Sequence, residues 1–581
     1  MAFLLLYLLV ISSIVPISFQ IIENNVWNSL NQSLHGRLRK AYPFAIPCFS
    51  SYESHSIPSE PEMCSDIKQN YRSPAFRTEH FSGFMNSQSE ICLANSIEQC
   101  LLDNTDSNSA IPANSTCFQG NVPSYYVEVG DVQDVITAFQ FAKLHGITVS
   151  IKNTGHDYLT RNTLRSSLSI WTHHLRHLSF SPNFSPAGCH SSHSYQAITV
   201  GAGVNFDELY TFAEEHNSTS IGGYASTVGA SGGWLLGGGH SNLSPVYGLG
   251  VDRVVEITLV TPDGALRTVN NCQDPDLFWA LRGGGGGSFG VVISSTSTVE
   301  PRMPVAVASV SYVPRNNSEK IAWIDMLINS SLAWGLQGWG GHITGSNFIH
   351  TNPLLNLSAA TESMRPAINF ANEHNGTAVI EVLPSWYAFY KKYVIPLQRG
   401  VGEMRFLSTR LIPASMFEKA TSRRQLLSFF EHVVGLGIDP YIPVTTPFIY
   451  PYTPNSTSAT PAWRNSLWHV STSISIPWNS SDADRLTALA KLTRLTKIKE
   501  ELAPKSGAYV NEANPFTQDW KKAWWGDDNY ERLLKVKRRV DREGVLKCWK
   551  CVGFDEYDKE GKFRCLMEMQ RRIETSLERE Q

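Results

Sequence analysis

The pattern of apolar and polar residues first becomes regular near residue 125. Alternation predicts a strand over Tyr125–Val129, and apolar residues at helical spacing predict a helix that begins after Asp131 and ends at Gly146. A mostly β-branched run, Ile147–Ile151, predicts a buried second strand that stops at a polar turn. Strand, helix and strand therefore lead to a turn that carries His156 at its tip.

A second strand and helix follow, over Ala197–Val200 and Asn205–His216, and a glycine-rich region then occupies residues 222–250. Glycine inside a regular element costs about 0.5–1 kcal/mol relative to alanine, so this density argues against a long helix or strand. A flexible linker would avoid the interspersed Trp234 and Leu235. The region is therefore predicted to be a folded loop around a large flat ligand.

Turn and cap signals predict the next elements. A hairpin joins Val254–Val260 to Ala265–Val269, Asp274 caps a short helix, and a strand is expected over Phe289–Ser295. From about residue 301 glycine thins out and amphipathic helices appear, which predicts a second domain.

Two further stretches differ from this pattern. Residues 19–117 show little periodicity and are rich in Ser, Pro, Asn and Cys, so they are predicted to be a loop-rich lead-in held by disulfides. The tail from Lys559 is charged and has helical propensity.

The length and charge of the chain exclude some classes of partner. A chain of 581 residues with a net charge of −3 has room for two or more domains, and no basic cluster interleaved with aromatic residues predicts a nucleic-acid partner. The apolar run Met1–Ser18 is shorter than the roughly 20 residues that span a bilayer. It predicts a signal peptide over residues 1–20, with a signal anchor as the alternative and no stable membrane insertion.

Two other features agree with secretion. Asn-x-Ser/Thr sequons are abundant along the chain, and five of the ten cysteines cluster at Cys48, Cys64, Cys92, Cys100 and Cys117. Five cysteines cannot all pair with each other, so their connectivity stays open. The predicted location is the secretory pathway, in the extracellular space or the vacuolar lumen.

The turn before His156 is the main candidate for chemistry. Gly155 allows a tight or left-handed turn, and successive backbone N–H groups there can form a nest for a diphosphate. A histidine beside that nest could bond covalently to a cofactor. Taken alone, a Gly-His pair fits a hydrogen-bonded surface histidine equally well.

Several common motifs are absent or incomplete. No phosphate-binding P-loop sequence occurs, residues 201–206 lack the third glycine of a dinucleotide fingerprint, and residues 229–233 spell a nucleophile elbow without a preceding strand. Cys548 and Cys551 have no second pair at zinc spacing, so a disulfide to another cysteine is predicted and no metal is expected.

Five linked motifs lie, in this order, at residues 152–158, 227–229, 237–240, 248–252 and 278–286. Together they resemble the FAD-binding domain of the vanillyl-alcohol-oxidase/p-cresol-methylhydroxylase family over residues 118–300. Tyr509-Val510-Asn511 and residues 525–537 resemble the C-terminal element of berberine-bridge-enzyme-like oxidases, and the turn at His156 is similar to fungal, isoamyl-alcohol-oxidase-like members.

The resemblance implies an α+β fold: a two-subdomain FAD-binding domain of the vanillyl-alcohol-oxidase type and a substrate domain with an antiparallel sheet covered by helices. The implied organisation is an N-terminal region over 21–117, the FAD-binding domain over 118–300, the substrate domain over 301–504, a berberine-bridge-like segment over 505–557 that returns to the FAD domain, and a charged tail over 558–581.

Site residues follow from the same resemblance. His156 matches the histidine that is bonded to the flavin, and Ala225 stands where many relatives have a second attachment through cysteine, so a single covalent link to FAD is implied. Tyr509 is the implied catalytic base, which requires a neighbour that depresses its pKa. The implied cofactor-binding residues are His156, Lys152, Asn153, Thr154, Gly155, Thr227, Val228, Gly229, Gly238 and Asn511.

The implied function is an oxidase of fungal secondary metabolism that transfers a hydride from an alcohol or a natural-product intermediate to covalent flavin and then to O2. Val228 matches a position that favours reaction with oxygen. The alternatives are a flavin-dependent oxidative cyclase or dehydrogenase and a non-enzymatic secreted ligand-binding glycoprotein. Active-site neighbours could include His240 and Tyr158, and an aromatic substrate pocket could include Trp386, Tyr387, Tyr390, Tyr450, Tyr452 and Trp468.

Overall fold

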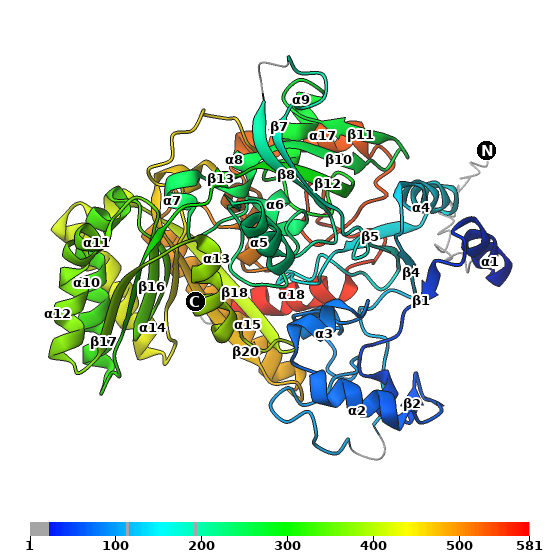
Figure 1. Cartoon of the computed structure of the whole chain (residues 1–581). Coiled ribbons are helices and arrows are strands. Elements are labelled where there is room, and N and C mark those ends of the chain that lie inside the picture. The colour runs from blue at the N-terminus through cyan, green and yellow to red at the C-terminus, as the bar shows by residue number, and fades with distance from the viewer. Residues whose placement is uncertain (1–22, 112–114, 191–193, 580–581) are drawn as a thin grey trace, which may run out of the picture.

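The computed structural model describes residues 23–111, 115–190 and 194–579 (Figure 1). The predicted signal peptide lies outside the described residues. Within them the chain has an α+β fold, as predicted, with three main sheets. None of the helices in these ranges is both long and apolar enough to cross a bilayer.

The first sheet carries the turn at His156. Its order is β1-β4-β6-β5, with β4 (Tyr125–Glu128), β6 (Ser167–Trp171) and β5 (Thr148–Lys152) parallel and β1 (Leu38–Lys40) antiparallel to β4. Helix α4 (Val132–His145) connects β4 to β5. The predicted strand, helix and strand are confirmed. The Asp131 carboxylate caps α4, and Gly146 ends the helix in the left-handed conformation.

The second sheet is antiparallel, in the order β11-β10-β12-β8-β7. The predicted hairpin is confirmed as β10 (Val254–Val260) and β11 (Leu266–Val269), and the short helix capped by Asp274 is α9 (Pro275–Leu281). The last predicted strand begins later than expected, at Val291. The other members are β7 (Leu178–Phe184), β8 (Tyr195–Gly201) and β12 (Val291–Thr298), and α5 (Phe206–Glu215) follows β8.

A seven-stranded antiparallel sheet forms the centre of the region that follows residue 301. Its order is β17-β14-β16-β15-β19-β20-β18, and Figure 1 shows α10 (Asn317–Leu336) and α12 (Arg365–Glu373) at its outer side. The strands are β14 (Val305–Ser311), β15 (Gly340–Thr344), β16 (Asn347–Asn352), β17 (Thr377–Leu383), β18 (Met404–Pro413), β19 (Tyr441–Val444) and β20 (Ser466–Ile476).

The two faces of this sheet have different partners. Ile343, Ile442 and Trp468 belong to the apolar core that includes residues of α10 and of α14 (Ala420–Gly435). Successive side chains of a strand point to opposite faces, so the neighbouring His342 and His469 face away from these helices.

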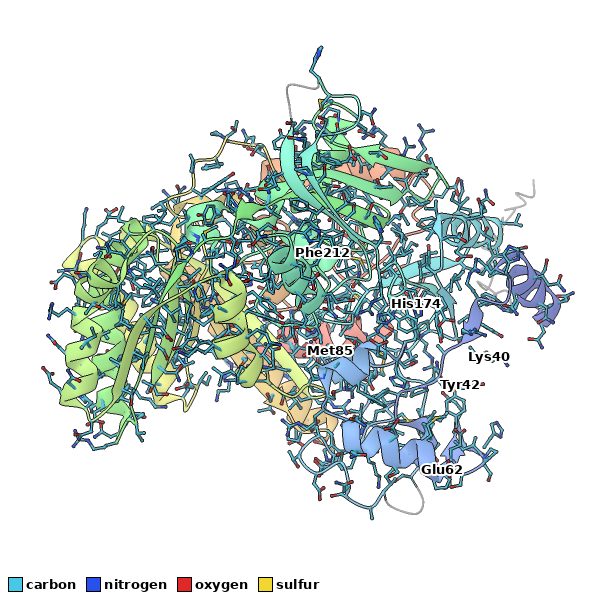
Figure 2. The ribbon with its side chains drawn as sticks, in the orientation of Figure 1. Lys40, Tyr42, Glu62, Met85, His174 and Phe212 are labelled. Carbon is cyan, nitrogen blue, oxygen red and sulfur yellow. A yellow bond between two sulfur atoms is a disulfide. The ribbon has the colours of Figure 1, made fainter. Side chains whose placement is uncertain are left out.

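The N-terminal region contains more regular structure than predicted. It holds α1 (Asn24–Ser33), α2 (Pro61–Asn70) and α3 (Pro74–Thr78), each too short to give a clear apolar period. Figure 2 shows Glu62 of α2 and Tyr42 at the outer edge of this region. Disulfides Cys48–Cys64 and Cys100–Cys117 hold it, while Cys92 bonds to Cys565 in the tail.

The C-terminal segment packs against residues 235–292 in one apolar core. Tyr509, Trp524 and Trp525 share one apolar cluster with Leu235 and Leu281, and the predicted tail helix is confirmed as α18 (Arg564–Glu578). Cys548 and Cys551 bond to each other rather than to cysteines elsewhere. The helix before this segment is α15 (Asp482–Leu502). The helices within it are η7 (Val510–Glu512), α16 (Trp520–Trp524) and α17 (Asp527–Val540).

The glycine-rich region of residues 222–250 is compact, but it contains three short helices that its composition did not predict: α6 (Gly233–Gly237), α7 (Ser244–Tyr247) and α8 (Gly250–Arg253). The remaining short elements are η1 (Ile46–Cys48), β2 (Ser51–Tyr52), β3 (His55–Ser56), η2 (Ser87–Ser89), β9 (Ser218–Thr219), β13 (Glu300–Pro301), α11 (Leu357–Ser363), α13 (Trp386–Phe389), η3 (Tyr390–Val394), η4 (Ile395–Leu397), η5 (Ala414–Phe417) and η6 (Pro461–Asn465).

Candidate active site

A cavity lies where the first two sheets and the C-terminal segment meet. Its walls come from the turn after β5, residues 228–236, residues 286–292 and Asn511. Seven of the predicted site residues line it: Asn153, Thr154, Gly155, His156, Val228, Gly229 and Asn511.

His156 is fixed on the cavity wall by its neighbours. Gly155 has a φ of +93°, and a Cβ there would come within 3.2 Å of Lys152 Cε, so this turn requires glycine. The Nε2 atom of His156 lies 2.7 Å from Thr227 Oγ1. Burial, with a smaller effect of the nearby Lys152, lowers the pKa of His156 to about 4. The imidazole is therefore neutral at neutral pH, with Nε2 engaged by Thr227.

Asn153 and Gly229 approach each other closely across the cavity wall. The Asn153 Nδ2 donates to Thr172 Oγ1 at 3.2 Å and also to the Ala202 carbonyl oxygen. The Gly229 N–H donates to Thr154 Oγ1 at 3.2 Å, and a Cβ on Gly229 would lie 2.2 Å from Asn153 Oδ1. The absence of a side chain at Gly229 thus lets the two loops meet.

Several buried polar atoms on this wall have no hydrogen-bond partner in the described chain: Asn153 Oδ1, Arg161 Nε and Nη1, and both amide atoms of Asn162. Buried polar atoms are rarely left unpaired, so such a group indicates a bound polar ligand. A dinucleotide with phosphate and hydroxyl oxygens supplies both donors and acceptors. The residues therefore fit FAD.

Arg161 and Asn162 were missed from the sequence. Arg161 donates through Nη2 to Asn511 Oδ1 at 2.8 Å, which links the turn after β5 to the C-terminal segment. In the sequence, Arg161 stands five residues after His156, and Asp157 is the other charged residue of residues 153–161. This isolated arginine could have indicated a role at the site.

The other predicted cofactor-binding residues do not line the cavity. Lys152 points behind the turn, where Nζ donates to the His80 carbonyl oxygen at 3.3 Å and lies over the rings of Phe84 and Trp171. Burial, with the nearby Arg77, lowers its pKa to about 7. Thr227 does not line the cavity itself, but its hydroxyl contacts His156, which does.

Gly238 and Tyr509 lie together next to the cavity. Gly238 has a φ of +141°, and a Cβ there would contact the Tyr509 ring at 3.5 Å. The Asn511 Nδ2 donates to the Tyr509 hydroxyl at 2.8 Å and to the Gly233 carbonyl oxygen at 2.7 Å. Burial, and then the negative charge of Glu512, raise the pKa of Tyr509. This is the opposite of the shift that a tyrosine base requires.

A cluster of histidines surrounds Glu512 on the other side of Tyr509. The His240 Nε2 lies 3.0 Å from Glu512 Oε1, and His469 Nε2 lies 3.9 Å from Oε2. The rings of His240 and Tyr509 meet edge to face with centroids 5.1 Å apart. Burial raises the pKa of Glu512, but His240, His469 and His342 outweigh it and lower that pKa to about 2. The carboxylate is therefore ionised at neutral pH.

Sequence reasoning found His240 but missed Glu512, His342 and His469. In the sequence, His342 stands between Gly341 and Ile343, and His469 stands between Trp468 and Val470. A single polar residue between apolar neighbours in each strand was the signal that could have indicated them.

The aromatic residues suggested for a substrate pocket lie outside the cavity wall. Trp386 and Tyr390 pack around Tyr210, and Trp468 packs against Phe417 and Phe430 in the core under the helices. Aromatic side chains that do contact the histidine cluster are Tyr224, Tyr441, Trp463 and Tyr509.

Comparison with known proteins gives the class. The FAD binding domain family matches residues 123–270, and the berberine and berberine-like family matches residues 508–548. The chain is 40% identical over 559 residues to "FAD-linked oxidoreductase OXR2" of Pyricularia oryzae, covering 94% of this chain and 95% of that protein. The chain therefore belongs to the FAD-linked oxidoreductases of the vanillyl-alcohol-oxidase type with a berberine-like C-terminal segment, and it is an enzyme.

Solved structures agree with the fold. The VAO-type flavoprotein MtVAO615 of Myceliophthora thermophila C1 superimposes with a TM-score of 0.78 at 27% identity, over 93% of this chain and 96% of that one. Glucooligosaccharide oxidase from Acremonium strictum, whose FAD is described as 6-S-cysteinyl and 8α-N1-histidyl, gives a TM-score of 0.62 at 18% identity, over 74% of this chain and 92% of that one.

Proposed function

We propose that this enzyme is a secreted oxidase that carries FAD on His156 through a single covalent bond and oxidises an alcohol or a natural-product intermediate, with O2 as the electron acceptor. The observation that carries the proposal is the setting of His156: a neutral imidazole on the cavity wall whose Nε2 is already engaged by Thr227. The Nδ1 atom is then the ring nitrogen available for the bond.

The chemistry that FAD supplies when bound is acceptance of a hydride from the substrate and transfer of the electrons to dioxygen, with release of hydrogen peroxide. The chain contributes the cradle. Asn153, Arg161 and Asn162 offer unpaired polar atoms to the dinucleotide, and Asn511 bridges this wall to Tyr509.

A single attachment is supported by the cysteine inventory. All ten cysteines of the chain are in disulfides, and the described residues include no free thiol. Ala225 stands in the turn that accepts a hydrogen bond from the Val228 N–H, where a second link would need cysteine.

Val228 supports oxygen as the acceptor, because a small apolar side chain on the cavity wall leaves space for dioxygen. Five disulfides support an oxidising compartment. The fungal origin of the OXR2 relative supports a role in fungal secondary metabolism.

The experiment is expression of the secreted protein, measurement of flavin absorbance after acid precipitation, and a peroxide assay with benzyl alcohol, cinnamyl alcohol, octanol and xylobiose. We expect acid-stable flavin, peroxide with at least one hydroxyl compound, and rapid reoxidation of photoreduced enzyme by air. Flavin that stays reduced in air would contradict the oxidase, and turnover without peroxide would favour the cyclase or dehydrogenase alternative.

A further inference from the structure

The oxidation of an alcohol requires a group that takes the hydroxyl proton, and the surroundings of Tyr509 disfavour that role. Tyr509 is 2% exposed and its hydroxyl accepts a hydrogen bond from Asn511, while the charge with the largest effect on its pKa is the carboxylate of Glu512. A negative neighbour disfavours the phenolate that a base must form. Another polar side chain next to the cavity is therefore expected to accept the proton.

The His240–Glu512 pair is in the right place. Glu512 directly follows Asn511, which lines the cavity, and His240 packs against the ring of Tyr509. The side chains of His240 and Glu512 are 12% and 19% exposed. His469 from β20 closes the other side of the carboxylate and is fully buried.

The hydrogen-bond pattern leaves one ring nitrogen of His240 free. Nε2 lies 3.0 Å from the Glu512 carboxylate, an arrangement in which the imidazole N–H donates and the carboxylate accepts. Nδ1 is buried and has no partner in the described chain. An imidazole whose N–H is held by a carboxylate has its lone pair on the other nitrogen, and the carboxylate stabilises the cation that forms when that nitrogen takes a proton.

We infer that His240 accepts the substrate's hydroxyl proton at Nδ1 and that Glu512 is the positioning residue that fixes the imidazole and stabilises its cation. This rests on the proposed oxidase function. The O–H bond breaks and its proton moves to Nδ1, the C–H bond breaks and its hydride goes to FAD, and the product is the carbonyl compound. Dioxygen then takes the two electrons and the proton of the transferred hydride, and the proton held by His240 is the second, which completes hydrogen peroxide.

The titratable groups that face Glu512 come from several elements. They include His240 from the glycine-rich region, His342 from β15, Tyr441 from β19, His469 from β20, and Tyr158 and Tyr509 from loops. Lys499 of α15 acts on His469. Burial lowers the pKa of His342 and of His469 to about 3, so both are neutral at neutral pH and neither competes with His240 for the proton.

The first test is rapid mixing of the holoenzyme with benzyl alcohol, cinnamyl alcohol, octanol and xylobiose without oxygen. H240Q and E512Q should keep covalent flavin but reduce it at least about 100-fold more slowly, as expected for loss of a general base or its partner. E512D should recover part of the rate, and H374Q, which changes an imidazole at the end of α12, should match the wild type. Rates within about threefold of wild type in H240Q or E512Q would overturn the inference.

The second test needs no substrate. Diethyl pyrocarbonate reacts with unprotonated imidazole, so the pH dependence of labelling at His240, read by peptide mass, reports its protonation. We expect the midpoint in E512Q to fall by at least about one pH unit, because an opposite charge at this distance favours the imidazolium. An unchanged midpoint, or no reaction at any pH, would overturn the inference.

These readouts separate the two proposals. If the wild type oxidises none of the four alcohols, the proposed function is in doubt, while the labelling still decides whether Glu512 controls His240. His240, His469 and Glu512 also have ligand atoms within 4.8 Å of one another. One equivalent of a transition metal retained after dialysis against a chelator would overturn the proton-transfer role, because the imidazole nitrogens would then be metal ligands.

Discussion

His156 Nε2 and Thr227 Oγ1 lie 2.7 Å apart, although the two residues lie in different loops and are 71 positions apart in the chain. This contact joins the turn after β5 to the glycine-rich loop and sets the orientation of the imidazole. With Nε2 engaged, Nδ1 is the atom that can bond to FAD. The contact therefore links the fold of two separate loops to the chemistry of one nitrogen.

Thr227→Val should slow covalent attachment of FAD without preventing FAD binding. The change keeps the shape of the side chain and removes a hydrogen bond, which is worth about 0.5–1.5 kcal/mol, so we expect attachment to slow by about 3–10-fold. The measurement is the time course of acid-stable flavin after FAD is added to apoprotein. Thr268→Val on β11 is the matched control, and attachment at the wild-type rate in Thr227→Val would contradict the role of the contact.

Gly237→Ala should displace Asn511. A Cβ on Gly237 would lie 2.3 Å from Asn511 Nδ2, too close for the amide to keep its bonds to Tyr509 and Gly233. Losing these bonds should lower the flavin content per protein at least about fivefold, as expected when buried polar groups lose their partners. Gly435→Ala, where a Cβ meets no atom within 4 Å, is the control.

The Gly237 effect should also vanish when its target is removed. In a double-mutant cycle, Gly237→Ala in an Asn511→Ala background should cost no more than Asn511→Ala alone, because contacting residues couple. Additive losses would show that Gly237 acts by another route.

Removing the Cys92–Cys565 disulfide should destabilise the protein more than removing Cys48–Cys64. The first closes a loop of 473 residues and ties α18 to the N-terminal region, whereas the second closes a loop of 16. Loss of a native disulfide costs about 2–5 kcal/mol, and the entropic part grows with loop length. Thermal unfolding of C92S/C565S and C48S/C64S should give the larger fall in Tm for the first pair, and equal falls would contradict this account.

His350→Phe should make the protein less sensitive to acid. Burial between Phe348 and Trp334 lowers the pKa of His350 to about 3 from 6.5 in the unfolded chain. Between these two values the unfolded state binds more protons than the native state, so this histidine makes stability fall as the pH falls below 6.5. Removing His350 should reduce the loss of unfolding free energy between pH 6.5 and 5 by about 2 kcal/mol.

Urea unfolding of wild type and His350→Phe at several pH values is the measurement for this effect, with the same replacement at the exposed His432 as the control. An identical pH dependence in wild type and His350→Phe would contradict the assignment.

The sequence was most informative where local chemistry decides the structure. Asp131 and Gly146 bound α4 as predicted, and Gly155 takes the left-handed conformation that its position before His156 requires. Caps and glycine turns act within a few residues of the chain, so a single sequence shows them.

The sequence did not show what sheet registration brings together. His342 and His469 lie on strands of the same sheet face, and Glu512 comes from a segment that returns from the C-terminus. Each is one polar residue among apolar neighbours until the sheet aligns them. The sequence also did not show that Lys152 lies behind the turn and not on the cavity wall, because a shift of one residue along β5 moves a side chain from one face to the other.

The covalent bond between His156 and FAD can be tested directly on the peptide that carries this histidine. Trypsin should release the peptide Asn153–Arg161, which contains His156 as its one histidine. Tandem mass spectrometry of that peptide from the secreted enzyme is predicted to show the mass of FAD on His156, and the same peptide from His156→Ala should be free of it. Flavin on another residue, or acid-stable flavin that persists in His156→Ala, would contradict the account.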